Sequence, residues 1–142
     1  LVSSKSIFGL LVSIALLQFL ATVNDWFWTY RWFDIPMHFL GGFWVAMVFF
    51  RFIYPRFQIT NYQLLITVIL SSAFVALVGV FWEFFEFMLD FAFSKSPNPS
   101  GFRIFRGYAV DLYRDTLKDL LMDLLGGLTV FFVNLYSSKE AR

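Results

Sequence analysis

The feature of this sequence that most constrains its fold is a set of four apolar runs, each long enough for a helix to cross a bilayer, which takes roughly 20 residues. The runs cover about residues 7–24, 35–54, 62–92 and 115–136. They are apolar on every side, whereas the strands of a membrane β-barrel are short and alternate apolar with polar residues. We therefore predict an all-α polytopic membrane protein, folded as a bundle of four transmembrane helices.

Composition and charge narrow the class of protein further. Only 15% of the residues are charged, against about 25% in soluble domains, which argues against a soluble enzyme. The formal net charge is +1, so the charge does not favour nucleic acid as a partner. The absence of cysteine excludes disulfides and thiolate chemistry. The sequence also has no nucleotide-binding loop and no nucleophile motif, so it does not identify catalytic residues.

The chain is predicted to form a single integral membrane domain, residues 1–142, with one long connection at residues 94–114. Its first run resembles a signal peptide in length and in its Lys5 flank, but no A-x-A pattern precedes Asn24, so we expect a retained helix. Basic residues divide evenly between the two sides of the bundle, which leaves the positive-inside rule undecided. We expect both termini in the cytoplasm, because Lys5, Arg51 and Arg56 lie close to span ends.

Polar residues are predicted to gather at one membrane face. In a four-span chain, the second and fourth spans begin on the side where the third span ends. His38 lies near the start of the second span, Glu83 and Glu86 lie near the end of the third, and Asp115 and Asp119 lie in the first turns of the fourth. These five residues are our candidate site, and two further candidates are Asp34 and Asp123. Glycines in the second and fourth spans would let the helix backbones approach closely: Gly41, Gly42, Gly126 and Gly127.

Burying several carboxylates together is costly, so something must compensate their charge. A bound divalent ion, protons or nearby basic residues would do so, and carboxylates with one imidazole suit Mg²⁺, Mn²⁺, Fe²⁺ or Zn²⁺. Three arginines either balance the acids or contact lipid headgroups: Arg103, Arg106 and Arg114.

Each candidate also has a simpler explanation. His38 would be an interfacial histidine bonded to a neighbouring carboxylate or carbonyl. Glu83 and Glu86 would be solvated if the third span leaves the membrane near residue 81. Asp115 would cap the fourth span, but a cap does not account for Asp119, which is therefore the strongest carboxylate candidate.

An ordered set of residues resembles a known family. The set is Asp34-x3-His38-Phe39-x-Gly41-Gly42, then Trp82-Glu83-x2-Glu86, then Asp115-Thr116-x2-Asp119 leading to Gly126. Over about residues 34–127, this order resembles the YjdF-like family of small bacterial inner-membrane proteins and, more distantly, VanZ-like membrane proteins. The resemblance implies a compact multi-helix fold in the bacterial cytoplasmic membrane and singles out these residues, but it implies no particular reaction.

Two functions fit the pattern. In the first, the acidic/His cluster binds a divalent cation or protons, and an enzyme built on it would act on a lipid-linked substrate through metal-activated water. In the second, the chain is a non-enzymatic subunit that packs against larger membrane proteins or forms a homo-oligomer in the lipid bilayer. A cation site requires the carboxylates to converge within about 5 Å of one point, whereas a packing subunit would have them dispersed and paired with arginine.

Overall fold

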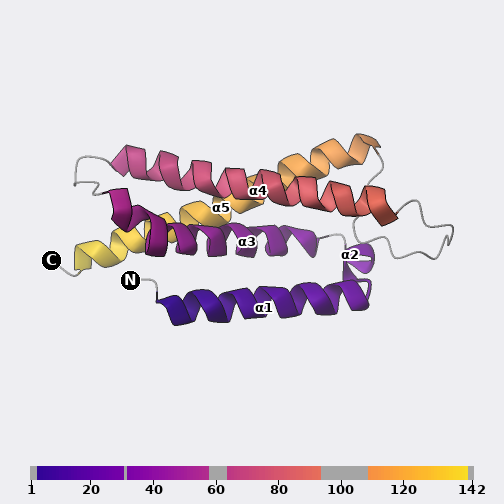
Figure 1. The fold of residues 1–142 in the computed structure, drawn as a ribbon, viewed down its shortest axis with the longest axis horizontal. Helices are drawn as coiled ribbons and strands as arrows, with labels where there is room; N and C mark the ends of the chain where they lie inside the picture. Colours follow the sequence, from indigo (N-terminus) through magenta and orange to yellow (C-terminus); the bar gives the residue numbers. More distant parts are fainter. Residues whose placement is uncertain (1–2, 31, 58–63, 94–108, 141–142) are drawn as a thin grey trace.

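Helices make up the fold in the computed structural model of this chain, which describes residues 3–30, 32–57, 64–93 and 109–140. The four long helices are α1 (Ser4–Val23), α3 (Asp34–Val48), α4 (Leu64–Phe93) and α5 (Ala109–Glu140). The short helix α2 (Trp26–Thr29) turns the chain between α1 and α3. The long helices run side by side along the molecule (Figure 1). No strand occurs in these ranges, so the predicted all-α class is confirmed.

Three helices in the described ranges are long and apolar enough to cross a membrane: Ser4–Val23, Asp34–Ile53 and Leu65–Leu89. They correspond to the first three apolar runs. The fourth run forms α5, whose first half carries several acidic residues. That α5 is a fourth membrane crossing therefore remains a prediction, and the position of α5 alongside the other long helices is consistent with it (Figure 1).

The helix boundary that differs most from the sequence expectation is the start of α5, whereas the end of α4 agrees with it. Helix α5 begins at Ala109, about two turns before the expected start of the fourth span, so Asp115 lies inside the helix and does not cap it. Helix α4 continues without interruption to Phe93. At the other end of the bundle, α3 passes into a π-helical turn over Phe49–Ile53 and a 3-10 turn over Tyr54–Phe57. Pro55 explains the end of regular helix there, because it has no backbone N–H to donate.

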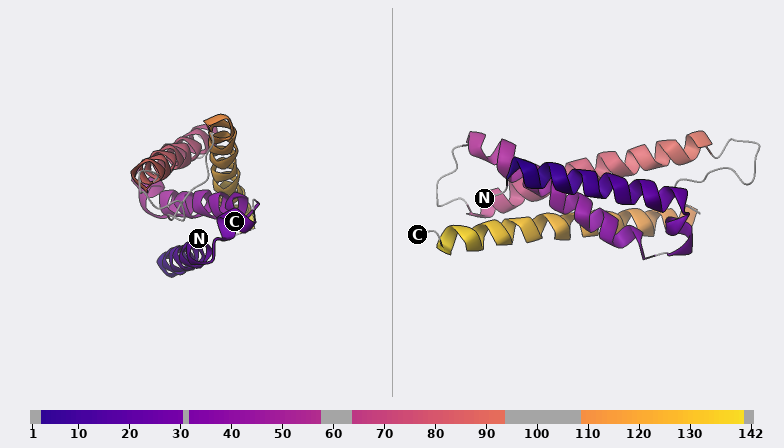
Figure 2. Two further views of the ribbon diagram at one scale, coloured as in Figure 1. Left: turned by 90° about the vertical axis from the view of Figure 1, so that its right-hand side faces the viewer. Right: turned by 90° about the horizontal axis from the view of Figure 1, so that it is seen from below.

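Helices α3, α4 and α5 form the core, and α1 lies against the outer side of α3 (Figure 2). The buried apolar cluster comprises Ile7, Val45, Ala46, Met47, Val75 and Val130. Trp44 on α3 connects α3 to α1, because its Nε1 donates a hydrogen bond to the backbone carbonyl of Ile7 at 3.0 Å. Much of the remaining surface of α1 consists of exposed apolar side chains such as Phe8 and Phe19, as expected of a helix facing lipid.

Two glycines let the backbones of α3 and α5 touch. A Cβ atom at Gly42 would collide with the backbone carbonyl of Asp123, and one at Gly126 would collide with the carbonyl oxygen of Phe39. The sequence prediction that glycines permit close helix approach is confirmed at these positions. This close contact fixes α5 against the first turns of α3, where the polar candidates lie.

Candidate functional site

His38 lies at the centre of the polar candidates. It is in the second turn of α3 and is only 6% exposed. Its Nε2 atom lies 3.5 Å from Oδ1 of Asp34, one turn earlier on the same helix. Its Nδ1 atom lies 3.6 Å from Oδ1 of Asp123 on α5. Carboxylates on both sides therefore fix the orientation of the imidazole ring.

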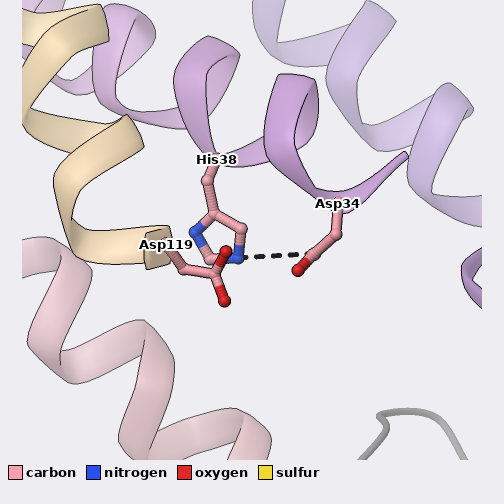
Figure 3. A group of neighbouring side chains, drawn as sticks. All are labelled: Asp34, His38 and Asp119. Atoms are coloured by element: carbon pink, nitrogen blue, oxygen red, sulfur yellow. Dashed lines mark ion pairs between the residues drawn. The ribbon is translucent and has the colours of Figure 1, made fainter. Parts of the chain in front are cut away.

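Asp119 approaches the same imidazole from α5 (Figure 3). It is 3% exposed, and ligand atoms of Asp34, His38 and Asp119 all lie within 4.8 Å of one another. Oδ1 of Asp119 makes no hydrogen bond, although the ammonium nitrogen of Lys118 lies 3.3 Å from it. Because buried polar atoms are nearly always hydrogen-bonded, an exception calls for an explanation such as an ion or a water molecule.

Glu83 and Glu86 on α4 face His38 from a third helix. Their ligand atoms and that of His38 also lie within 4.8 Å of one another. Thr116 donates a hydrogen bond to Oε2 of Glu83 at 2.8 Å, and the indole nitrogen of Trp82 donates to Oε1 of Glu86 at 2.7 Å. The other oxygen of Glu83, Oε1, is buried and has no hydrogen-bond partner. Each carboxylate is thus held by one oxygen through a protein donor.

Asp123 on α5 is also buried, at 6% exposed, and its carboxylate lies beside glycines of two neighbouring helices. A Cβ atom at Gly79 on α4 would come within 2.6 Å of Oδ2 of Asp123, and one at Gly41 on α3 would lie 3.8 Å from Oδ1. The carboxylate therefore occupies space that a larger residue at position 79 would fill. Asp123, which the sequence placed among the additional candidates, contacts His38 directly.

Lys118 is the cation that the sequence analysis did not include in the site. Its Nζ atom lies 2.6 Å from Oδ1 of Asp115, 3.3 Å from Oδ1 of Asp119 and 3.6 Å from Oδ2 of Asp34. The sequence did contain a signal for this role, since Lys118 lies three residues after one candidate aspartate and directly before another. Thr116 and Trp82 were predicted only as members of the residue set that resembles a known family, although each donates a hydrogen bond to a glutamate of the site.

The remaining sequence candidates in the described residues, Asp115 and Arg114, form no ion pair with His38. Asp115 is paired with Lys118, and its side chain is 41% exposed; it belongs to neither group of potential metal ligands. Arg114 is exposed on α5. Arg103 and Arg106, the other two arginines considered as charge-balancing or headgroup-binding residues, fall outside the described residues.

The donor set of this cluster suits a hard divalent cation. One imidazole and several carboxylate oxygens converge from three helices, and such ligands are those that Mg²⁺, Mn²⁺, Fe²⁺ and Zn²⁺ accept. Hydrogen bonds to the far oxygen of a ligating carboxylate are also typical of protein metal sites. The residues present therefore fit a metal ion, and the cluster contains two buried carboxylate oxygens without a hydrogen-bond partner in the described residues, one on Glu83 and one on Asp119.

The fold and the cluster together define a helical membrane protein with an acidic/His cluster near one end of its bundle. The chain belongs to a family described as "Predicted membrane protein (DUF2238)", whose model matches residues 5–139. This match is consistent with the membrane-protein resemblance inferred from residues 34–127, while the finer likeness to the YjdF-like and VanZ-like proteins remains a prediction. No curated protein matches the chain, and no solved structure does.

Proposed function

We propose that this membrane protein binds a divalent cation at the cluster around His38. The observation that carries the proposal is the convergence of ligand atoms from α3, α4 and α5 within 4.8 Å, in two groups that share His38. The buried oxygens without hydrogen-bond partners on Glu83 and Asp119 support it. An ion bound in the cluster would give such an oxygen a partner, and Oε1 of Glu83 also has no ion pair in the described residues.

The charge balance of the cluster supports the same proposal. Six carboxylates lie around one lysine and one histidine: Asp34, Glu83, Glu86, Asp115, Asp119 and Asp123. Like charges held this close repel one another strongly in a medium of low dielectric constant. A bound divalent cation would neutralise two of the excess negative charges, and bound protons are the alternative compensation.

The geometry favours this function over that of a packing subunit. A subunit that uses its acids to hold partners would have them dispersed and paired with arginine, whereas here they converge on His38 and Lys118. The ion pairs found within the described ranges join aspartate to lysine or histidine. We therefore prefer cation binding to a role as a subunit that uses these acids to hold a partner.

The proposal extends to a reaction class. A bound divalent cation supplies a Lewis acid and an activated water. The cluster lies at one end of the bundle, in the first turns of α3 and towards the end of α4 (Figure 1), where the headgroup of a lipid-linked substrate would reach it. Incubation of the purified protein with a labelled total lipid extract and each divalent ion tests this extension, and unchanged lipids in every case would argue against it.

We also propose that the protein resides in the bacterial cytoplasmic membrane with both termini in the cytoplasm. Helix α1 begins and α5 ends at the same end of the bundle, opposite the cluster (Figure 1), which supports a common side for the termini. Reporter fusions to the two ends would measure their sides, and a periplasmic signal from either one would contradict the proposed orientation.

The metal content of the detergent-purified protein tests the central proposal. We expect a stoichiometric divalent metal in the wild type, measured by mass spectrometry, and its loss in both His38→Ala and His38→Asn, because each removes the imidazole. Asp25→Asn is the matched control: Asp25 is exposed in the turn after α1, belongs to neither group of potential metal ligands, and asparagine tolerates its left-handed backbone. This variant should keep the metal.

The same measurement can also overturn the cation proposal. If metal is absent from every sample, including protein reloaded with each candidate ion, and all variants unfold at the same temperature, the cation proposal is wrong. Bound protons would then be the next explanation to test for how the negative charge of the carboxylates is neutralised.

A further inference from the structure

The cluster around His38 contains two sets of acids that differ in what neutralises them. One set surrounds the ammonium group of Lys118, and we call it the lysine half: Asp34, Asp115 and Asp119. The other set combines two glutamates on α4 with the histidine on α3, and we call it the glutamate half: His38, Glu83 and Glu86. The ligand atoms of the glutamate half lie within 4.8 Å of one another, and those of Asp34 and Asp119 in the lysine half lie equally close to one another and to His38.

The lysine half already contains a cation. The ammonium nitrogen of Lys118 lies between 2.6 and 3.6 Å from an oxygen of each of its three aspartates. An ion bound by Asp34, His38 and Asp119 would share two of those carboxylates with the ammonium group. Two positive charges at such short range repel each other strongly wherever solvent is scarce, so the lysine disfavours a metal ion in this half.

The glutamate half is arranged differently. Within the described part of the chain, neither Glu83 nor Glu86 forms an ion pair with lysine or arginine. Each uses one oxygen to accept a neutral donor, from Thr116 and Trp82 respectively. Oε1 of Glu83 is buried and makes no hydrogen bond. This is the pattern of ligating carboxylates whose outer oxygens are oriented by the protein.

His38 is oriented from outside this half as well. Asp123 lies 3.6 Å from its Nδ1 atom and is itself confined by Gly79, whose added Cβ would come within 2.6 Å of the Asp123 carboxylate. A ligating histidine usually has a carboxylate or carbonyl beside its second nitrogen. Asp123 is positioned to perform that function.

We propose that the divalent cation binds in the glutamate half, with His38, Glu83 and Glu86 as its protein ligands, while Lys118 serves as a fixed internal counter-ion for Asp34, Asp115 and Asp119. This inference rests on the proposed function and specifies which atoms perform it. It also assigns positioning roles to Thr116, Trp82 and Asp123, which orient the ligands without contacting the ion.

Isosteric substitutions in the two halves test the assignment. Mn²⁺ affinity of the detergent-purified protein would be measured by electron paramagnetic resonance titration. Glu83→Gln and Glu86→Gln should each weaken binding at least about tenfold, because both remove a ligand charge. Asp34→Asn and Asp119→Asn should weaken it much less. The reverse ranking, with the aspartate variants impaired and the glutamate variants near wild type, would overturn the inference.

A second pair of variants tests the same assignment with substitutions that are less able to unfold the protein. Thr116→Val removes the hydrogen bond to Glu83 but keeps the shape of the side chain, and Thr129→Val is its matched control. Thr129 is exposed on the same helix, and its hydroxyl donates only to the carbonyl of Leu125 within α5, at 2.9 Å. We expect Thr116→Val to weaken Mn²⁺ binding several-fold and Thr129→Val to leave it unchanged. Equal affinities for these two variants would contradict the positioning role of Thr116.

These outcomes are distinct from failure of the cation proposal itself. If the wild type binds no metal, or if His38→Asn binds as well as the wild type, the proposed function is wrong. If the wild type binds metal and His38→Asn does not, the proposed function stands, and the ranking of the glutamate and aspartate variants decides which half holds the ion.

Discussion

The two ends of the α3–α4–α5 bundle are held together by different forces. At the end where α3 begins, carboxylates, a histidine and a lysine meet within ion-pair and hydrogen-bond distance. Further along the helices, the contacts are apolar, with Val75 and Val130 almost fully buried and aromatic rings in edge-to-face or tilted contact around Phe49 and Phe50. The same three helices thus change from a charged interface to an apolar one over a few turns.

The difference shows how each end can be specific. Lipid chains are as apolar as the side chains of the core, so apolar contacts between membrane helices depend on close packing more than on the hydrophobic effect. The charged end gains its specificity from the pairing of particular atoms. The contact of α3 with α5 at Gly42 and Gly126 lies between the two ends, so both ends depend on it.

The strongest test of this comparison is to separate α3 from α5. Gly42→Ala would place a Cβ atom against the backbone carbonyl of Asp123, and neither backbone can move aside without displacing its helix. We expect a loss of about 3 kcal/mol in the free energy of unfolding, at the upper end of ordinary overpacking costs. Circular dichroism during thermal unfolding in detergent would measure it.

Gly9→Ala is the matched control, because an added Cβ at Gly9 in α1 meets nothing within 4 Å. It should match or slightly exceed wild-type stability, since alanine favours helix. If Gly42→Ala unfolds at the same temperature as Gly9→Ala, the close contact of α3 and α5 is not as described.

Removal of the internal counter-ion should have the next largest effect. Lys118→Met leaves the carboxylates of Asp34, Asp115 and Asp119 without their ammonium partner, although the lysine side chain is 30% exposed and partly screened. In the presence of a chelator, we expect Lys118→Met to lower the free energy of unfolding by about 2 kcal/mol. This loss of stability should become smaller as salt is added.

Lys5→Met, which removes an exposed lysine at the opposite end of the bundle, is the control for a general charge effect. Equal stability of the Lys118 and Lys5 variants at low salt would show that Lys118 does not stabilise the cluster.

The smallest expected effect concerns the apolar end. Val75→Ala removes two methyl groups from a side chain that is 1% exposed, and we expect a loss of about 1.5 kcal/mol from the lost contacts and the cavity. Unlike the Lys118 variant, it should show no salt dependence, because no charge is involved. Val133→Ala, at an exposed position on α5, should have no measurable effect. If the loss of stability in Val75→Ala depends on salt, the two ends of the bundle are not held together by different forces as described.

Much of the fold followed from the sequence, because long apolar runs have few stable arrangements in a bilayer. The positions of α1, α3 and α4 agree with the first three runs. The start of α5 could not be predicted from hydropathy in the same way. Residues 109–114 include charged and aromatic side chains without an apolar stripe, so hydropathy did not reveal that the helix begins there.

The location of the cluster could be anticipated from topology, whereas the partners within it could not. Asp119 and Asp123 are four residues apart and therefore share one face of α5, and both lie near His38 in the structure. The role of Lys118 depends on the direction of a long side chain, which helical phase does not determine. The same holds for Thr116, whose hydroxyl reaches across to Glu83 on α4.

The placement of Lys118 on α5 has a consequence for biosynthesis. Ribosomes make the chain from its N-terminus, so α3 and α4, with Asp34, Glu83 and Glu86, leave the exit tunnel before the lysine does. Until then the early helices carry acids whose counter-ion has not been translated. When α5 is inserted, it forms the glycine contact with α3 and places the ammonium group of Lys118 beside these acids. A nascent chain arrested before residue 118 should therefore insert poorly into the membrane and be degraded by quality-control proteases.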